Sequence, residues 1–430
     1  MALTEEQQLA LDYAIEGKSF FLTGPGGTGK SFILERIRDT LTFRGKKVAI
    51  TAMTGCAALL LGNKAKTLHS WASVGIAKEP ATVLTAKIRQ SQKLFRRWLG
   101  TDTLIVDEVS MLTPEFLEKL NKIASAVRRD PRPMGGLQVI FVGDFFQLPP
   151  VNKDTKDTMF VFESPEWKQI VPYRVELKQI VRQKDPVFQQ ILKEARYGRL
   201  SKEFLQILKR RQNLPWQSLD IRPTLLFSRK AKVDHINTTN LKALTGERRI
   251  YKAETVKLPI EATKNIDTES EEVKFILNKM DRDAAYSPEL ILAEGAQVML
   301  LTNLDFEAEL VNGSRGVVVG FTKDAISLPI VKFRTGLPMP IGPATWDCDE
   351  IEGIQRKQIP LRLAYALTIH KAQGATLDCA LIDIGSSTFE CGQAYVALSR
   401  VRSLDSLYIW DLEQSAFRTH DKVRTFYEAS

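Results

Sequence analysis

Cysteine is scarce in this chain of 430 residues, and its few cysteines do not cluster. Cys56, Cys348, Cys379 and Cys391 form no C-x-x-C pair, which excludes the usual spacing of a zinc site or a disulfide framework. No apolar run approaches the roughly 20 residues that span a bilayer, and the N-terminus lacks the apolar core of a signal peptide. These absences predict free thiols, a reducing compartment and no membrane partner.

Acidic residues are outnumbered by basic ones. Lys and Arg total 60 against 51 for Asp and Glu, which gives a formal net charge of +9. Hydrophobic residues make up 44% and charged residues 26% of the chain, as in ordinary globular proteins. The basic excess suits a polyanionic partner, most commonly nucleic acid, although a surface that only aids solubility would give the same count.

The most informative stretch is residues 20–31, where an apolar run ends in a glycine-rich loop that opens an amphipathic segment. The loop completes the pattern G-x-x-x-x-G-K-[ST]. Its glycines let backbone N–H groups face a polyphosphate, Lys30 supplies a charge for the β- and γ-phosphates, and the Ser31 hydroxyl can bind Mg²⁺. A simple glycine-rich turn is the alternative, but the predicted strand before it and helix after it favour a phosphate loop. The predicted nucleotide-binding residues of this loop are Gly24, Pro25, Gly26, Gly27, Thr28, Gly29, Lys30 and Ser31.

Short apolar runs alternate with helical patterns over the first part of the chain. Strands are predicted at 20–22, 48–51, 104–106 and 139–142. This alternation predicts an α/β fold with a parallel sheet covered on both faces. Ligands of such sheets collect at the carboxyl ends of the strands, where the polar motifs of this sequence also lie.

Two polar motifs follow predicted strands. Asp107 and Glu108 end the strand at 104–106, and a strand that ends in paired acids after a phosphate loop is the Walker B pattern. Asp107 is then expected to hold Mg²⁺ through water, and Glu108 to activate the attacking water. Gln147 follows the strand at 139–142, and its amide could read the γ-phosphate. The alternative for the acid pair is a strand that ends in solvated acids, and the alternative for the Gln147 segment is a simple turn closed by prolines.

Residues 78–100 are basic, with Glu79 as their acidic residue. Their apolar residues recur at helical spacing, so a helix with a packed stripe and a solvated basic face explains the pattern. The alternative is a small inserted element that touches nucleic acid. The apolar stripe comprises Leu84, Ile88, Phe95 and Trp98, and the basic residues include Lys87, Arg89, Lys93, Arg96 and Arg97.

The pattern restarts near residue 176 as a second α/β lobe without a phosphate loop. We expect helices at 186–196 and 201–212, a strand at 224–228 with a helix after it, strand-like segments at 361–367 and 380–384, and a helix that leads to Arg400. An insertion interrupts this lobe. We interpret residues 246–290 as loop with short strands and residues 293–335, with their Asn-Gly and Gly turns, as a small β-barrel.

Together these segments resemble the motor core of superfamily 1 helicases, and most closely the Pif-type (petite integration frequency) family of DNA helicases. The resemblance runs from residue 3 to about residue 410, and its order of motifs is typical of the family. Because little sequence flanks this core, we expect a compact bacterial or viral-type member. The stretches that carry the resemblance are 24–31, 51–58, 66–70, 107–112, 141–150, 177–183, 297–316, 367–374 and 397–401.

The resemblance implies two RecA-like parallel-sheet lobes, a small wedge insertion in the first and a small β-barrel insertion in the second. The implied parts are a first, ATP-binding lobe at 1–62 and 101–175, a basic wedge at 63–100, a second lobe at 176–250 and 356–430, and an inserted loop and barrel at 251–355.

The resemblance also assigns roles to individual residues. Gln7 matches the glutamine that reads adenine, and Gly374 joins the nucleotide site. Arg182 and Arg400 match the arginines that reach the γ-phosphate from the second lobe, while Gln147 couples closure of the lobes to the DNA strand. Lining of a single-stranded DNA track is implied for Thr54, Thr67, His69, Pro149, Ser228, His370 and Lys371.

The implied function is an ATP- and Mg²⁺-dependent DNA helicase that moves 5′ to 3′ on single-stranded DNA and opens forked duplexes. G-quadruplexes and RNA–DNA hybrids are carried as further substrates, with roles in DNA repair, recombination and telomere maintenance. We expect a monomer in solution and, for a bacterial source, a cytoplasmic protein associated with the nucleoid. Two alternatives remain. One is the motor of a RecD-like nuclease complex or a conjugative relaxase, and the other is a nucleic-acid-binding scaffold that uses ATP as a switch.

Overall fold

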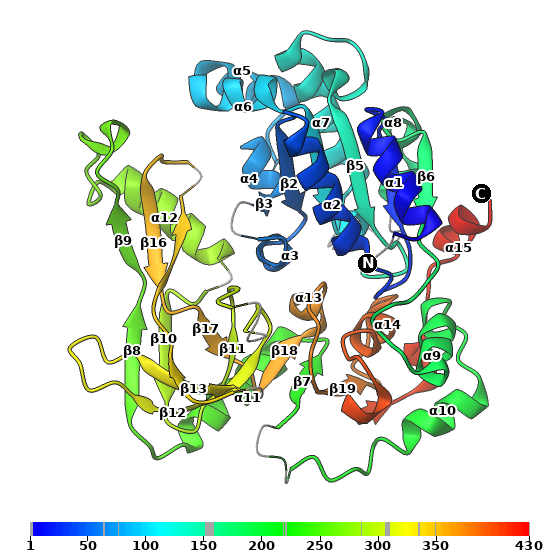
Figure 1. Cartoon of the computed structure of the whole chain (residues 1–430), viewed down its shortest axis with the longest axis vertical. Coiled ribbons are helices and arrows are strands. Elements are labelled where there is room, and N and C mark those ends of the chain that lie inside the picture. Colours follow the sequence, from blue (N-terminus) through cyan, green and yellow to red (C-terminus); the bar gives the residue numbers. More distant parts are fainter. Residues whose placement is uncertain are drawn as a thin grey trace. The chain divides into compact units, whose positions relative to one another are not determined.

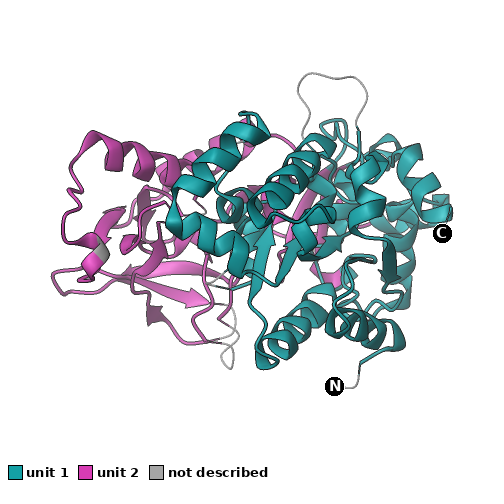
Figure 2. Cartoon of the chain, turned by 90° about the horizontal axis from the view of Figure 1, so that it is seen from above, with its two compact units in different colours: residues 1–208, 384–404, 412–430 teal, residues 209–383, 405–411 magenta. Residues whose placement is uncertain are grey.

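The computed structural model describes residues 3–62, 65–75, 77–150, 159–217, 219, 222–284, 286–305, 310–333, 336–348 and 350–429. The chain forms two compact units, shown in teal and magenta in Figure 2. Unit 1 consists of Met1–Leu208, Ile384–Leu404 and Leu412–Ser430, and unit 2 of Lys209–Asp383 and Asp405–Asp411. No helix in the described part of the chain is long and apolar enough to cross a membrane.

Unit 1 is built on a six-stranded parallel sheet, as the alternation of apolar runs and helices predicts (Figure 1). The four predicted strands are confirmed, and two short edge strands, β3 and β6, complete the order β3-β2-β4-β5-β1-β6. The strand bounds are β1 Phe20–Thr23, β2 Val48–Ala52, β3 Lys66–Thr67, β4 Thr103–Asp107, β5 Gln138–Gly143 and β6 Tyr173–Glu176. Thr23 pairs with Gly143 and with Glu176, so the carboxyl ends of the central strands lie level with one another.

Apolar side chains cover both faces of this sheet, so β1 is buried throughout and β5 is buried from Val139 onward. On one face, Ile33 and Ile37 of helix α2 belong to a core cluster with Phe20 and Leu22. On the other face, Phe141 stacks on Trp167 with ring centroids 5.2 Å apart. The helices of unit 1 are α1 Glu5–Ile15, α2 Lys30–Phe43, α3 Gly55–Leu60, α4 Leu68–Ala72, α5 Ala81–Gln90, α6 Gln92–Gly100, α7 Pro114–Arg128, α8 Pro165–Ile170, α9 Pro186–Arg196, α10 Lys202–Lys209, α14 Gln393–Leu398 and α15 Asp421–Glu428.

The predicted helical segment at 78–100 is two helices, α5 and α6, because Ser91 interrupts it. The backbone of Ser91 is extended, and its Oγ accepts a hydrogen bond from Leu94 N as the cap of α6. The packed stripe is confirmed at Leu84, Ile88 and Trp98, which are buried. The prediction of a solvated basic face is wrong for Arg97, because its guanidinium donates to the carbonyls of residues 70 and 71 and to Ser73 Oγ. A wedge role for this segment stays a prediction.

Unit 2 contains a four-stranded sheet in the order β18-β7-β19-β20, in which β7 pairs in parallel with β18 and β19. The predicted strand at 361–367 is two strands, because β17 pairs with β11 in one sheet whereas β18 pairs with β7 in another. The bounds are β7 Thr224–Phe227, β17 Leu361–Leu363, β18 Ala366–Thr368, β19 Ala380–Ile384, β20 Leu407–Leu412, α11 Lys230–Ala243 and α13 Ile369–Ala372.

The inserted part of unit 2 holds a five-stranded sheet in the order β14-β13-β12-β11-β17, with antiparallel pairs throughout. Closure into a barrel stays a prediction, and residues 306–309 and 334–335 of the predicted barrel lie outside the described residues. The loop interpretation of 246–290 is wrong at 271–283, where helix α12 packs a narrow stripe that includes Val273 and Leu277. Further bounds are β8 Arg248–Lys252, β9 Glu254–Lys257, β10 Glu289–Ala293, β11 Gln297–Leu300, β12 Arg315–Phe321, β13 Pro329–Phe333, β14 Met339–Pro340, β15 Ala344–Asp347, β16 Ile354–Gln358 and α12 Glu271–Asp283.

The segments 384–404 and 412–430, which the sequence assigns to the second lobe, belong to the same compact unit as the phosphate loop. They do so because α14 and α15 contact the loop region through two buried tyrosines. Tyr395 accepts a hydrogen bond from Gly26 N at 2.7 Å, and the hydroxyls of Tyr427 and Thr23 lie 2.6 Å apart. The lobe boundaries themselves stay a prediction.

Candidate active site

The glycine-rich loop lies between β1 and α2, as predicted, and its glycines make close backbone contacts. A Cβ atom on Gly24 would lie 2.5 Å from the carbonyl oxygen of Leu177, so only glycine fits there. Gly27 has a φ of +86°, and its Cβ would lie 2.6 Å from Gln183 Oε1. The loop is therefore in close contact with the segment 177–183. The N–H groups of residues 181 and 182 both donate to the Gly27 carbonyl.

Lys30 is the first residue of α2 and points its ammonium group back over the loop. Its Nζ donates to the carbonyl oxygens of Gly24 at 2.7 Å and Pro25 at 3.0 Å. Burial lowers the pKa of Lys30, against the opposing effect of the nearby acids Asp144 and Glu108. A lysine held at the start of a helix by its own loop can supply positive charge to a phosphate group. Ser31, the predicted Mg²⁺ ligand beside it, is exposed.

The predicted acid pair stands at the carboxyl end of β4. Asp107 ends the strand, and Glu108 adopts a left-handed backbone with a φ of +55°, which is costly for a residue other than glycine. The N–H group of Glu108 donates to Asp107 Oδ1 at 2.8 Å. Burial, with the Glu108 charge as a further cause, raises the pKa of Asp107 to about 7. A nearby divalent cation would favour the charged form of both acids.

The two predicted arginines meet at Ser399. Arg182 Nη1 donates to the Ser399 carbonyl at 3.3 Å, and Arg400 Nη2 donates to Ser399 Oγ at 2.6 Å. Burial, with the charges of Arg400 and Arg402, lowers the pKa of Arg182 to about 10, and burial also lowers the pKa of Arg400. Ser399 in turn lies beside the loop, because a Cβ on Gly26 would be 3.3 Å from Ser399 Cβ. Two guanidinium groups are thus held next to the phosphate loop.

Gln147 belongs to the loop after β5, and this loop is organised by a buried aspartate. Gln147 is buried, and its N–H group donates to the Asp144 carbonyl at 2.9 Å. The Asp144 carboxylate is fully buried and accepts from Arg196 of α9, with Nη2–Oδ1 at 2.9 Å and Nε–Oδ2 at 3.0 Å. It also accepts from Phe146 N and from the Tyr395 hydroxyl. Asp144 therefore joins the Gln147 loop to α9 and α14.

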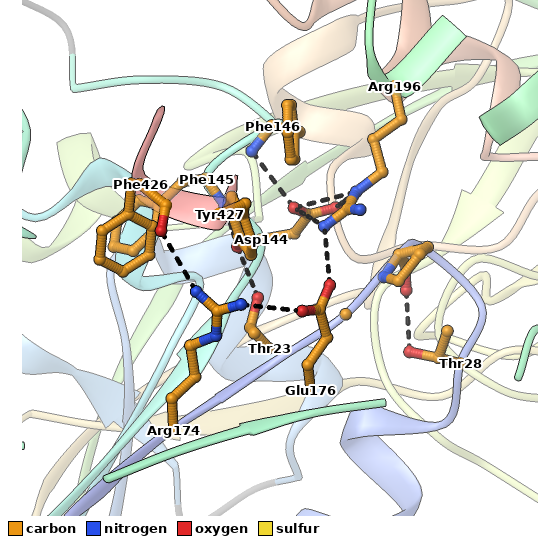
Figure 3. A network of polar contacts seen from close by, with 12 residues as sticks. Thr23, Thr28, Asp144, Phe145, Phe146, Arg174, Glu176, Arg196, Phe426 and Tyr427 are labelled. Carbon is orange, nitrogen blue, oxygen red and sulfur yellow. Dashed lines mark hydrogen bonds and ion pairs between the residues drawn. The ribbon is translucent and has the colours of Figure 1, made fainter. Parts of the chain in front are cut away.

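Figure 3 shows Tyr427 of α15 beside Asp144, whereas Phe426 lies further from this ion pair. The Arg196 guanidinium lies 4.4 Å from the ring centroid of Phe146 and 5.1 Å from that of Tyr427. Arg174 of β6 bonds Glu176 and the Phe426 carbonyl on the same side (Figure 3). The network holds the strand ends beneath the phosphate loop.

Gln7 occupies the first turn of α1, next to the end of the phosphate loop. Its side chain closes a capping box with Thr4, since Thr4 N donates to Gln7 Oε1 and Gln7 N donates to Thr4 Oγ1, both at 3.2 Å. A Cβ on Gly29 would lie 3.1 Å from Gln7 Nε2. The structure thus brings together Gln7, the phosphate loop, the acid pair, Gln147 and the two arginines within unit 1.

Comparison with known proteins shows the family to which this chain belongs. The family model of PIF1-like helicases matches residues 2–211, and that of the DNA helicase Pif1 2B domain matches residues 276–321. The crystal structure of Pif1 helicase from Candida albicans is 34% identical, with a TM-score of 0.82, and the match covers 100% of this chain and 99% of that one. The chain belongs to the PIF1-like helicase family.

Curated relatives of the PIF1-like helicase family are longer than this chain. The ATP-dependent DNA helicase PIF1 of Danio rerio is 38% identical over 428 residues, and that of Homo sapiens is 39% identical over 427 residues. Each match covers 99% of this chain, but the chain spans only 64% of the fish protein and 63% of the human one. A structure of Bacteroides sp Pif1 in complex with ADP-AlF4 is 27% identical, with a TM-score of 0.78, and the match covers 100% of this chain and 97% of that chain.

The residues that the Pif-type resemblance assigns to a DNA track fall into both units. In unit 1, Thr54 and Thr67 cap α3 and α4 by accepting hydrogen bonds from Ala57 N and Ser70 N. His69 stacks on Phe116 with ring centroids 4.2 Å apart, and Pro149 is buried. Unit 2 holds the other track residues and the predicted nucleotide-site glycine, which are Ser228, His370, Lys371 and Gly374.

In unit 2, three of these residues lie at the carboxyl ends of β7 and β18. Ser228 directly follows β7 and is buried, and its Oγ has no hydrogen-bond partner among the described residues. His370 is half-buried in α13, and burial lowers its pKa. Lys371 is exposed, and its N–H group donates to Thr368 Oγ1. Gly374 has a φ of +78° just beyond α13. Roles for these residues in this PIF1-like chain stay predictions.

Sequence reasoning missed the residues that hold the site in place. Asp144 lies in the stretch 141–150 but received no predicted role there, and Arg196 and Tyr395 lie outside every stretch that carries the resemblance. One signal was available, since Asp144 is a charged residue inside a run that is otherwise fit for burial and therefore needs a buried partner. The identity of that partner could not be read, because Arg196 and Tyr395 lie 52 and 251 residues further along the chain.

Proposed function

We propose that this chain is an ATP-driven DNA helicase that moves 5′ to 3′ along single-stranded DNA and separates the strands of forked duplexes. Family membership supports the helicase part, since relatives over 99% of the chain are named ATP-dependent DNA helicase PIF1. The observation that carries the proposal is the meeting of Arg182 and Arg400 at Ser399, beside the phosphate loop. A protein that only binds nucleotide does not need two arginines there.

The loop and acid pair fit a nucleoside triphosphate with Mg²⁺. The loop presents the start of α2, and Lys30 can exchange its two carbonyl contacts for phosphate oxygens. Asp107 and Ser31 are the residues that would hold the cation, and a half-buried Asp107 with a pKa raised to about 7 would be kept charged by it. The bound cation would supply charge neutralisation at the phosphates.

Hydrolysis is assigned to side chains that converge on the loop. Glu108 orients the attacking water and takes its proton, and its constrained backbone fixes the direction of its carboxylate. Lys30, Arg182 and Arg400 balance the negative charge that develops on the transferred phosphoryl group. The Gln147 amide contacts the γ-phosphate and so couples it to the loop after β5. The backbone N–H group of Gln147 bonds the Asp144 carbonyl.

Movement follows from closure and release of the two lobes around ATP, with single-stranded DNA gripped through its phosphates. One related structure is Bacteroides Pif1 bound to ssDNA, and another concerns DNA unwinding at forked dsDNA by Pif1 helicases, which supports these substrates here. The 5′-to-3′ direction, a monomeric state, and activity on G-quadruplexes and RNA–DNA hybrids come from the Pif-type resemblance and complete the proposal.

The test is strand separation on two partial duplexes, one with a 5′ and one with a 3′ single-stranded tail, in ATP and Mg²⁺. Lys30→Ala removes the charge from the loop, and Lys46→Ala makes the same change at an exposed lysine after α2 as a matched control. We expect opening of the 5′-tailed duplex by the wild-type protein and the control variant, and none by Lys30→Ala. A quadruplex with a 5′ tail and an RNA–DNA hybrid extend the same assay.

The other outcomes separate the alternatives. Opening of the 3′-tailed duplex contradicts the proposed direction of movement but still indicates a helicase. Hydrolysis that single strands stimulate, without opening of either duplex, indicates a motor that needs a partner, as in the RecD-like or relaxase alternative. Nucleotide binding without steady turnover indicates the scaffold that uses ATP as a switch.

A further inference from the structure

The phosphate loop is tied to α14 by a tyrosine hydroxyl. The Gly26 N–H group donates to the Tyr395 hydroxyl at 2.7 Å, and both residues are buried. A Cβ on Gly26 would lie 3.5 Å from the same hydroxyl and 3.3 Å from Ser399 Cβ, so α14 contacts this glycine closely along its last turn. These contacts join residues that lie 369 positions apart in the chain.

The Tyr395 hydroxyl has one proton, and this proton is directed away from the loop. The hydroxyl donates to Asp144 Oδ2 at 3.2 Å, which leaves its lone pairs to accept from Gly26 N. Burial and the Asp144 charge raise the pKa of Tyr395, so the hydroxyl keeps its proton at neutral pH. Arg196 and Phe146 N hold Asp144 in turn. The acceptor that faces Gly26 is thus fixed in place by a buried network.

Arg400 follows the carboxyl end of the same helix, two residues beyond Leu398. Ser399 N donates to the Tyr395 carbonyl at 3.0 Å, and Ser399 Oγ accepts from Arg400 Nη2 at 2.6 Å. Arg400 Nε also bonds the Val396 carbonyl at 2.8 Å. The Arg400 guanidinium is therefore bonded to α14 and to Ser399 at its carboxyl end, and the Tyr395 hydroxyl bonds α14 to the loop.

We propose that Tyr395 is a positioning residue, whose hydroxyl holds α14 against Gly26 and so fixes the distance between the phosphate loop and the Arg400 guanidinium. This inference rests on the proposed function, because Arg400 acts on phosphoryl transfer. Lys30, to which ground-state binding of the phosphates is assigned, is held by the Gly24 and Pro25 carbonyls and not by Tyr395. Loss of the hydroxyl should therefore slow hydrolysis more than it weakens nucleotide binding.

The first experiment compares Tyr395→Phe with Tyr427→Phe in the full chain. Both substitutions remove a buried hydroxyl next to the Asp144–Arg196 pair, but the Tyr427 hydroxyl bonds Thr23 and Phe145 N and makes no bond to the loop N–H. We expect Tyr395→Phe to lower the kcat of DNA-stimulated ATP hydrolysis about tenfold, as for the loss of one well-placed hydrogen bond. Its KM for ATP and its Kd for a fluorescent ADP analogue should stay within about twofold of wild type.

Tyr427→Phe should leave kcat within about twofold of wild type. It should lower the thermal unfolding midpoint by about as much as Tyr395→Phe does, because each substitution removes one buried hydroxyl. Equal losses of kcat in both variants would overturn the proposal, since they would report a general loosening of the network. A Kd raised about tenfold with kcat unchanged would also overturn it, because Tyr395 would then shape the loop and not the place of Arg400.

The second experiment is a double-mutant cycle with Arg400→Ala, measured by single-turnover hydrolysis with the protein in excess over ATP. If Tyr395 acts through Arg400, adding Tyr395→Phe to Arg400→Ala should cost less than about twofold further in rate. A further loss of about tenfold would refute the proposal. A wild-type protein that does not hydrolyse ATP with single-stranded DNA contradicts the proposed function itself, whereas an active wild type with an additive cycle contradicts only the role of Tyr395.

Discussion

The Asp144–Arg196 pair gives the most direct prediction on stability, because both side chains are almost completely buried and their contacts are bidentate. In Arg196→Met, the Asp144 carboxylate keeps only the Phe146 N–H group and the Tyr395 hydroxyl as donors. Removal of one partner of a buried ion pair costs about 3–5 kcal/mol, since the other charge stays buried without compensation. The lost contact of the guanidinium with the Phe146 ring adds about 0.5–2 kcal/mol.

We therefore expect Arg196→Met to lower the free energy of unfolding by about 4–6 kcal/mol, and the Tm of a unit of this size by about 10–20 °C. Urea unfolding followed by tryptophan fluorescence measures the first quantity, and Trp167, which packs against Phe145 near the pair, lies in the affected unit. Adding Asp144→Asn should recover at least about half of the loss, because the buried charge is then gone and the new amide oxygen can still accept from Phe146 N.

Arg132→Met is the matched control. Arg132 pairs with Asp130 at 2.6 Å, but its side chain is 73% exposed, so solvent screens the pair and the urea midpoint should not change measurably. A loss below about 1 kcal/mol in Arg196→Met, or a double variant less stable than Arg196→Met, would refute the reasoning, because neither result is compatible with an uncompensated buried carboxylate.

Three further predictions concern the two units. Gly27→Ala should weaken nucleotide binding at least about tenfold, because its Cβ would meet Gln183 Oε1, whereas Gly45→Ala has a similar positive φ in open space and should not. Glu108→Gln should lower kcat about 10²–10⁴-fold and keep the Kd for nucleotide, with exposed Glu115→Gln as control. Burial lowers the pKa of His370, so stability should fall as pH drops below about 6.5, and His370→Gln should flatten this dependence in unfolding measured from pH 7.5 to 5.5.

The parts of the fold that the sequence predicts well are those whose signals are local. The phosphate loop, the acid pair after β4 and the four central strands all follow from residues within about ten positions of one another. Helix α12 was missed although Val273, Ile276, Leu277 and Met280 recur at helical spacing, because this stripe lies within a charge-rich stretch that was interpreted as a whole. The break between α5 and α6 at Ser91 depends on a cap that a periodic stripe conceals.

The parts that could not be predicted depend on partners far away in the sequence. The strand at 361–367 divides because β11 and β7, its two partners, belong to different sheets. The buried Asp144 carboxylate accepts hydrogen bonds from Arg196 and Tyr395, and neither the spacing nor the chemistry of these residues indicates that they meet. Motifs therefore indicate which residues act on a nucleotide in this chain, while the residues that place them have to be found in three dimensions.

This separation has a physical reason. Residues that touch a phosphate must present particular donors at particular spacings, so they leave a pattern. Residues that hold them need only fill a buried position and satisfy one another, and a Tyr–Asp–Arg set is one of many solutions. Here that solution draws on both ends of the chain, because Thr23 and Tyr427, whose hydroxyls lie 2.6 Å apart, are separated by 404 residues. The surroundings of the phosphate loop thus depend on α14 and α15, and a substitution in α14 can alter hydrolysis without touching the nucleotide.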